Sequence, residues 1–84
     1  MPVPIRVLFD PPVDWAYIYL RDIEPGGFAR TVTVPEVPGD IILDFDREWR
    51  LIGIEVMPAS RVLPTELLER AERVERLEPP TNRE

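Results

Sequence analysis

The stretch Asp40–Ser60, DIILDFDREWRLIGIEVMPAS, decides the fold class of this chain. It contains two apolar runs rich in β-branched residues, Ile41–Phe45 and Leu51–Met57, with a short charged link between them. Two such runs joined by a short polar connection are typical of a β-hairpin. The stretch therefore predicts two antiparallel strands, around which the rest of the chain can be placed.

Three further segments have the composition of strands, because aromatic and β-branched residues are common in sheets. They are Ile5–Phe9, Trp15–Leu20 and Arg30–Val34. Proline and glycine turns separate these segments, and the connections leave no room for crossover helices. We therefore expect the five strands to form an antiparallel meander, in which each strand pairs with the next along the chain.

After Pro58 the apolar residues recur with a period of about 3.6 rather than 2, which is the period of a helix. The apolar stripe consists of Leu63, Leu67, Ala71, Val74 and Leu77. It predicts one amphipathic helix over Pro64–Leu77, and Glu–Arg pairs at i,i+4 spacing would each add about 0.2–0.5 kcal/mol. These pairs are Glu66–Arg70, Glu69–Arg73 and Glu72–Arg76. The sequence thus predicts a single α+β domain over residues 1–78 and a disordered tail over 79–84.

Composition narrows the possible functions. The 84 residues include neither cysteine nor histidine, so thiol chemistry is excluded and the commonest general base is absent. The formal net charge of −6 argues against a surface for nucleic-acid phosphates. No apolar run is long enough for a bilayer, and the N-terminus has no secretory pattern. We expect a cytoplasmic, non-enzymatic protein without a cofactor or a membrane partner.

Both faces of the central strands are apolar. Alternation along a strand puts Trp15, Tyr17 and Tyr19 on one face of the sheet and Ala16, Ile18 and Leu20 on the other. One helix covers only one face of a small sheet, so the other face needs a second layer. We therefore expect a homodimer, with the three aromatic residues as candidate interface residues. They could also stack on nucleic-acid bases, but basic neighbours are missing.

The candidate chemical residues are carboxylates, chiefly Asp44, Asp46 and Glu55. Convergent carboxylates could bind a hard cation such as Mg²⁺ or Ca²⁺. The spacing imitates a calcium-binding EF-hand loop, but Trp49 stands where that loop needs glycine. Asp44 and Asp46 could instead cap a turn at the end of their strand.

Glu55 lies in the most apolar strand, where a buried carboxylate without a partner would cost several kcal/mol. It could be exposed at an edge or functional, but pairing with an arginine such as Arg6 or Arg30 is the preferred interpretation.

Three segments together resemble a known family. They are Phe9–Leu20 (FDPPVDWAYIYL), Asp40–Asp46 (DIILDFD) and Leu51–Ser60 (LIGIEVMPAS). Their order and spacing resemble the bacterial family catalogued as domain of unknown function 2283. The chain departs from the family in its hairpin link, where Trp49 argues against a tight glycine-type turn. The resemblance implies a small α+β protein without an established activity, in a family some of whose members are associated with antitoxins.

Two hypotheses follow. The first is a protein-interaction module that acts as a homodimer, with an antitoxin-like role as one version and another protein as a possible partner. The alternative is a carboxylate-based cation-binding domain or hydrolase that uses Asp44, Asp46 and Glu55.

Overall fold

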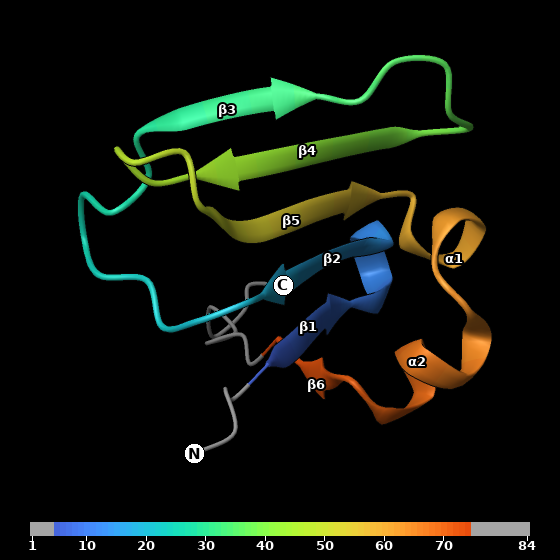
Figure 1. Cartoon of the computed structure of the whole chain (residues 1–84). Helices are drawn as coiled ribbons and strands as arrows, with labels where there is room; N and C mark the ends of the chain where they lie inside the picture. The colour runs from blue at the N-terminus through green and yellow to red at the C-terminus, as the bar shows by residue number, and fades with distance from the viewer. Residues whose placement is uncertain (1–4, 75–84) are drawn as a thin grey trace, which may run out of the picture.

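The computed structural model describes residues 5–74 of the chain. These residues form one sheet with short helices packed against it (Figure 1). The strands are β1 (Arg6–Asp10), β2 (Trp15–Tyr19), β3 (Arg30–Thr33), β4 (Asp40–Phe45), β5 (Leu51–Met57) and β6 (Glu72–Arg73). The helices are a 3₁₀ turn, η1 (Pro11–Val13), and two short α-helices, α1 (Ala59–Val62) and α2 (Thr65–Arg70). The fold is therefore α+β, and each of the five predicted strands is present with its bounds within one residue.

The strands do not follow one another across the sheet as a meander. Their order is β3-β4-β5-β2-β1-β6, so β2 pairs with β5 and not with β3. The long connection between β2 and β3 makes this possible, because it carries the chain across to the far edge (Figure 1). The predicted meander is thus wrong in its central pairing, although β3, β4 and β5 do form consecutive antiparallel pairs.

The predicted helix over Pro64–Leu77 is also wrong. Helix α2 ends at Arg70, and the chain then turns into β6, which pairs with β1 in parallel. The sheet is therefore mixed and has six strands instead of five. Leu77 and the tail predicted over 79–84 lie outside the described residues.

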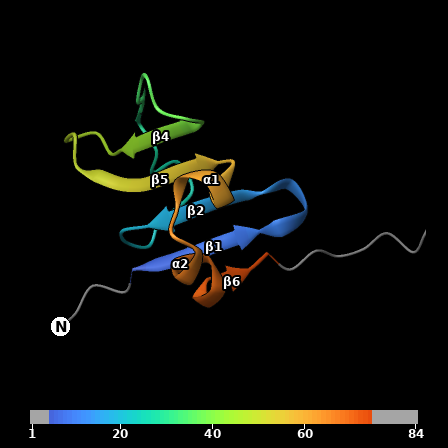
Figure 2. The ribbon, with the colours of Figure 1, turned by 90° about the vertical axis from the view of Figure 1, so that its right-hand side faces the viewer.

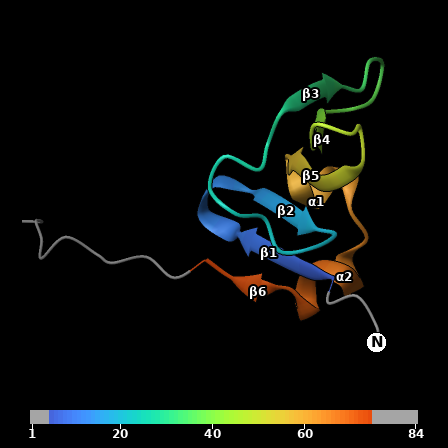
Figure 3. The same ribbon diagram turned by 60° about the vertical axis from the view of Figure 1, so that its left-hand side comes forward.

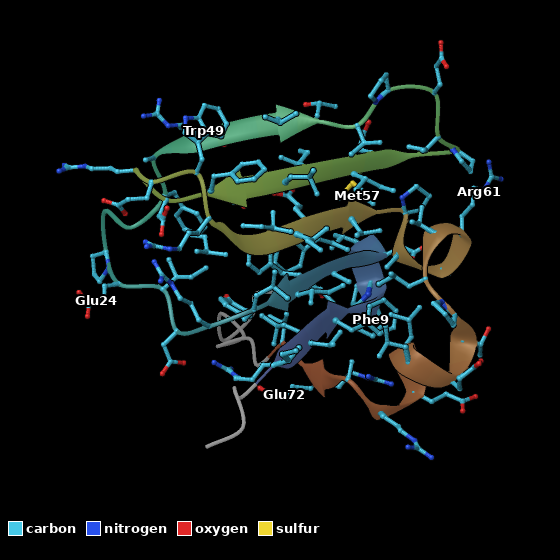
Figure 4. All side chains as sticks on the ribbon, viewed as in Figure 1. Phe9, Glu24, Trp49, Met57, Arg61 and Glu72 are labelled. Atoms are coloured by element: carbon cyan, nitrogen blue, oxygen red, sulfur yellow. The ribbon has the colours of Figure 1, made fainter. Side chains whose placement is uncertain are left out.

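The two α-helices lie on the same side of the sheet (Figures 2 and 3). On this side Ala16 of β2 packs against Ala59 of α1 and Leu68 of α2, and Phe9 of β1 joins them (Figure 4). Ile52 and Val56 of β5 face the same side by alternation and are almost completely buried. We call this the covered face, and the opposite side of the sheet the open face. None of the helices in the described part of the chain has the length and apolar character needed to cross a membrane.

A junction fixes the beginning of α1 against the loop that precedes β2. Asp14 adopts a left-handed conformation (φ 55°), and its carbonyl accepts a 2.7 Å hydrogen bond from the Ala59 amide. Its carboxylate accepts hydrogen bonds from the Ser60 amide at 2.9 Å and from the Ser60 hydroxyl at 2.5 Å. Two of the segments that resemble the family, Phe9–Leu20 and Leu51–Ser60, thus meet in one contact.

Candidate functional site

The open face of the sheet has a shallow concavity of about 330 Å³. It is lined by residues of four strands and of the connection before β3: Trp15, Tyr17, Tyr19, Phe28, Thr31, Asp44 and Glu55. Alternation along the strands places these side chains on one face, because Tyr17 lies opposite Glu55 and Thr31 lies opposite Asp44. The concavity thus contains all three aromatic residues predicted as interface candidates and two of the three candidate carboxylates.

Tyr17 lies at the centre of this site and is only 5% exposed. Its ring extends across Gly53 of the neighbouring strand, where the Cβ atom of any other residue would overlap the ring. Because Gly53 leaves that space free, the Tyr17 hydroxyl reaches β4 and donates a 2.7 Å hydrogen bond to Asp44 Oδ2. Burial raises the pKa of Tyr17 well above its usual value of 10.0, and the hydrogen bond to Asp44 is the second-largest cause of this shift. The hydroxyl therefore remains a donor and not a base.

Asp44 is almost completely buried, with 8% of its surface exposed. It accepts the Tyr17 hydrogen bond and a second one, at 3.2 Å, from the Thr31 hydroxyl. Both donors are neutral, and the described residues include no cation within ion-pairing distance of this carboxylate. Asp44 is thus a buried carboxyl group whose hydrogen-bond donors are two neutral hydroxyl groups.

The aromatic rings form a continuous group around Tyr17. Its centroid lies 6.2 Å from Trp15 in a stacked arrangement and 4.7 Å from Tyr19 in an edge-on arrangement. Phe28, from the connection between β2 and β3, packs edge-on at 6.3 Å. Because these neighbours cover Tyr17, the open face shields its own central ring, while Phe28 is 49% exposed.

Glu55 pairs with a different residue from those expected. It accepts a 3.1 Å hydrogen bond from the Trp15 indole Nε1 and forms no ion pair with Arg6 or Arg30. Arg6 instead forms two 3.0 Å hydrogen bonds with Glu72 of β6. Arg30 lies over the Trp49 ring at 4.6 Å, and Figure 4 shows Trp49 in the β4–β5 link. The predicted arginine partner of Glu55 was wrong because both arginines have partners elsewhere.

Asp46, the third candidate carboxylate, does not line the concavity. Its Oδ1 atom accepts hydrogen bonds from the Glu48 and Arg50 amides, each at 2.9 Å, and Arg21 forms an ion pair with Oδ2 at 2.9 Å. These contacts, led by the Arg50 amide, lower the pKa of Asp46 below its usual value of 3.8. Asp46 therefore caps the hairpin turn, as predicted, whereas Asp44 forms its bonds with other strands.

The hairpin turn is tight even though it contains tryptophan. The Trp49 amide donates to the Asp46 carbonyl at 3.1 Å, and the Asp46 amide donates to the Arg50 carbonyl at 3.0 Å. Trp49 itself takes the left-handed conformation (φ 64°) that favours glycine. Its ring packs against Phe45 at 5.3 Å and under Arg30, which offsets the backbone cost. The expectation that Trp49 would prevent a tight turn is therefore wrong.

Residues 5–74 contain no group of three His, Cys, Asp or Glu side chains that could hold a metal ion. Asp44, Asp46 and Glu55 each have a different set of hydrogen-bond donors. The concavity instead combines aromatic side chains with the two carboxylates of Asp44 and Glu55.

Two residues of this site, Phe28 and Thr31, were not predicted from the sequence. Phe28 lies in a connection, and nothing in the pattern of a loop places its ring against a strand. Thr31 could have been found from the register, because it lies directly opposite Asp44 in the β3–β4 pair.

Comparison with known proteins adds a family but no activity. No curated protein and no solved structure matches the chain. The family model described as "Protein of unknown function (DUF2283)" matches residues 6–60, which run from the start of β1 to Ser60 and include every residue of the concavity. Because this match covers more than half of the chain, the protein belongs to the DUF2283 family.

Proposed function

We propose that the protein is a non-enzymatic protein-interaction module that acts as a homodimer, and that two copies pair through β3. The observation that carries this proposal is the state of β3 at the edge of the sheet. All four of its residues are exposed, and it pairs with β4 on one side only. No described segment lies beyond it (Figure 1). An exposed strand with free backbone groups is a template for pairing with another chain.

The register of β3 shows which groups are free. The Val34 amide donates to the Ile41 carbonyl of β4 at 2.9 Å. Because hydrogen-bonding direction alternates along an antiparallel strand, the Val32 amide also points toward β4, whereas the amides of Thr31 and Thr33 point outward. A two-fold axis at Val32 would pair Thr31 of one copy with Thr33 of the other. Both outward amides and both outward carbonyls would then be satisfied.

The side chains of β3 also favour a symmetric contact. Val32 is 41% exposed, and on a two-fold axis it would lie against Val32 of the second copy. β3 has none of the lysines or prolines that commonly protect sheet edges. Pairing of this kind doubles the sheet and leaves the open face accessible in both copies.

An interaction role also agrees with the use of the carboxylates. Asp44 holds three strands together through Tyr17 and Thr31, and Asp46 caps a turn. Neither carboxylate has the free, solvent-facing position that a general base or a metal ligand needs. We therefore favour the binding role over the hydrolase and cation-binding alternatives.

The test is the mass in solution, measured by size-exclusion chromatography with light scattering. The wild-type chain should give twice the chain mass of 9.7 kDa. Val32→Lys places like charges opposite each other across the axis and should give a monomer, whereas Val32→Thr keeps a β-branched residue and should stay dimeric. A monomeric wild type, or a dimer that Val32→Lys leaves intact, would contradict the proposal.

A further inference from the structure

We infer that the concavity on the open face binds an arginine side chain of a partner protein. The inference goes beyond self-association through β3, because the concavity is complete within one chain. It rests on three properties of the site: its rings, its unneutralised carboxylates and its shape.

The aromatic surface is the first property. Of the four rings that line the concavity, Trp15, Tyr19 and Phe28 keep exposed surface, whereas Tyr17 is only 5% exposed. The electron-rich face of an aromatic ring attracts a cation within about 6 Å, and arginine is the cation most often found there. This chain already uses such contacts elsewhere, since Arg30 lies 4.6 Å from the Trp49 centroid and Arg73 lies 5.2 Å from that of Phe9.

The charge of the site is the second property. Asp44 and Glu55 both line the concavity, and their hydrogen-bond donors are the neutral groups of Tyr17, Thr31 and Trp15. Arg6 lies 5.2 Å from the centroid of the Tyr19 ring, but its guanidinium forms an ion pair with Glu72. Two carboxylates in a depression without a cation produce a focused negative potential. A positively charged guest would neutralise it.

The third property is geometric and favours guanidinium over ammonium. A guanidinium group is flat, so it can stack on a ring while its N–H groups donate to a carboxylate. Glu55 offers such a carboxylate, because the Trp15 indole occupies only Oε2 among the described contacts. The volume of about 330 Å³ is at the lower end of that of small-molecule sites. A shallow site of this size suits one side chain presented by a larger partner.

The experiment uses a chain with Trp49→Phe, which leaves Trp15 as its only tryptophan and places the fluorescence reporter in the site. The probe is N-acetyl-arginine-methylamide at constant ionic strength, and the matched neutral probe is N-acetyl-citrulline-methylamide, which has the same shape. We expect a saturable change of Trp15 fluorescence with the arginine probe. The citrulline and lysine analogues should bind with an affinity lower by a factor of about ten or more.

Two charge variants separate the site from general attraction to an acidic protein. Glu55→Gln can still accept the Trp15 hydrogen bond, so the chain should fold normally, but binding should weaken about tenfold. Glu48→Gln removes an equal charge from the exposed hairpin link and should leave binding unchanged. Equal binding of the arginine and citrulline probes, or equal loss in the two variants, would overturn the inference. Neither result depends on whether the chain dimerises.

Discussion

Tyr17 is the residue on which the open face depends, and its position follows from two others. Gly53 leaves the space that the ring occupies, and Asp44 accepts the hydroxyl hydrogen bond at the far side of β5. One side chain thereby joins β2 to β4 across the strand between them. This explains how an acidic residue can be buried in a small sheet that has no cation beside it.

Loss of the Tyr17 hydroxyl should be costly. Tyr17→Phe keeps the ring but leaves Asp44 with only the Thr31 hydrogen bond, so the free energy of unfolding should fall by about 1.5–3 kcal/mol. Tyr19→Phe is the matched control, because the Tyr19 hydroxyl forms no hydrogen bond within residues 5–74. Urea unfolding measures both changes. If the two variants were equally stable, the hydrogen bond between Tyr17 and Asp44 would not contribute as described.

The sequence could place the members of this site but not assemble them. Alternation in β2 correctly put Trp15, Tyr17 and Tyr19 on one face. The partner of Glu55 could not be predicted, because opposite charges suggest arginine whereas the pairing of β2 with β5 brings Trp15 within reach. Which side chains meet across neighbouring strands depends on the strand order, and a meander does not place β2 beside β5.

Among the elements, the β4–β5 hairpin depends on Asp46. Its carboxylate accepts two backbone hydrogen bonds inside the turn and binds Arg21 from the connection that follows β2. These interactions require the ionised form, and they are the cause of its lowered pKa. The stability of the turn therefore depends on pH.

The pH dependence has a definite sign. Because the pKa of Asp46 is lower in the folded state than its usual value of 3.8, its contribution to stability is complete above that value and is lost as the pH falls through the folded-state pKa. Asp46→Asn should lower the thermal midpoint at pH 7 and reduce the further loss below about pH 4. Thermal unfolding from pH 7 to pH 2.5 of both proteins measures this. Identical acid dependence of the two midpoints would contradict the role of Asp46.

The C-terminal helix was mispredicted for a reason that lies in another element. The helical period and the Glu–Arg pairs are local features worth a few tenths of a kcal/mol each. They are outweighed by the pairing of β6 with β1, in which the Val74 amide donates to the Phe9 carbonyl at 3.0 Å and Glu72 binds Arg6. Arg73 meanwhile donates to the Leu68 and Ala71 carbonyls at the end of α2. Tertiary pairing therefore ends the helix at a point that local propensity does not mark.

At the scale of the whole molecule, the sheet has two faces and two edges in different states. The covered face is closed by α1 and α2, and the centre of the open face is shielded by its own rings. The edge strands β3 and β6 each have a partner on one side only, but β6 has two residues whereas β3 has four, all of them exposed. The apolar patterning of the sequence predicted a second layer over the open face, which stays a prediction, and it gave no indication of the exposed edge at β3.

Residue-resolved hydrogen exchange of β3 tests pairing through this edge most directly. The Val32 amide points toward β4 and should be protected in every state of the folded protein. The Thr31 and Thr33 amides point outward and would donate to the second copy. They should therefore be protected in the wild type at high concentration, where the dimer forms, and exchange rapidly in Val32→Lys. Rapid exchange of Thr31 and Thr33 in the concentrated wild type, with Val32 still protected, would show that β3 pairs with no second copy.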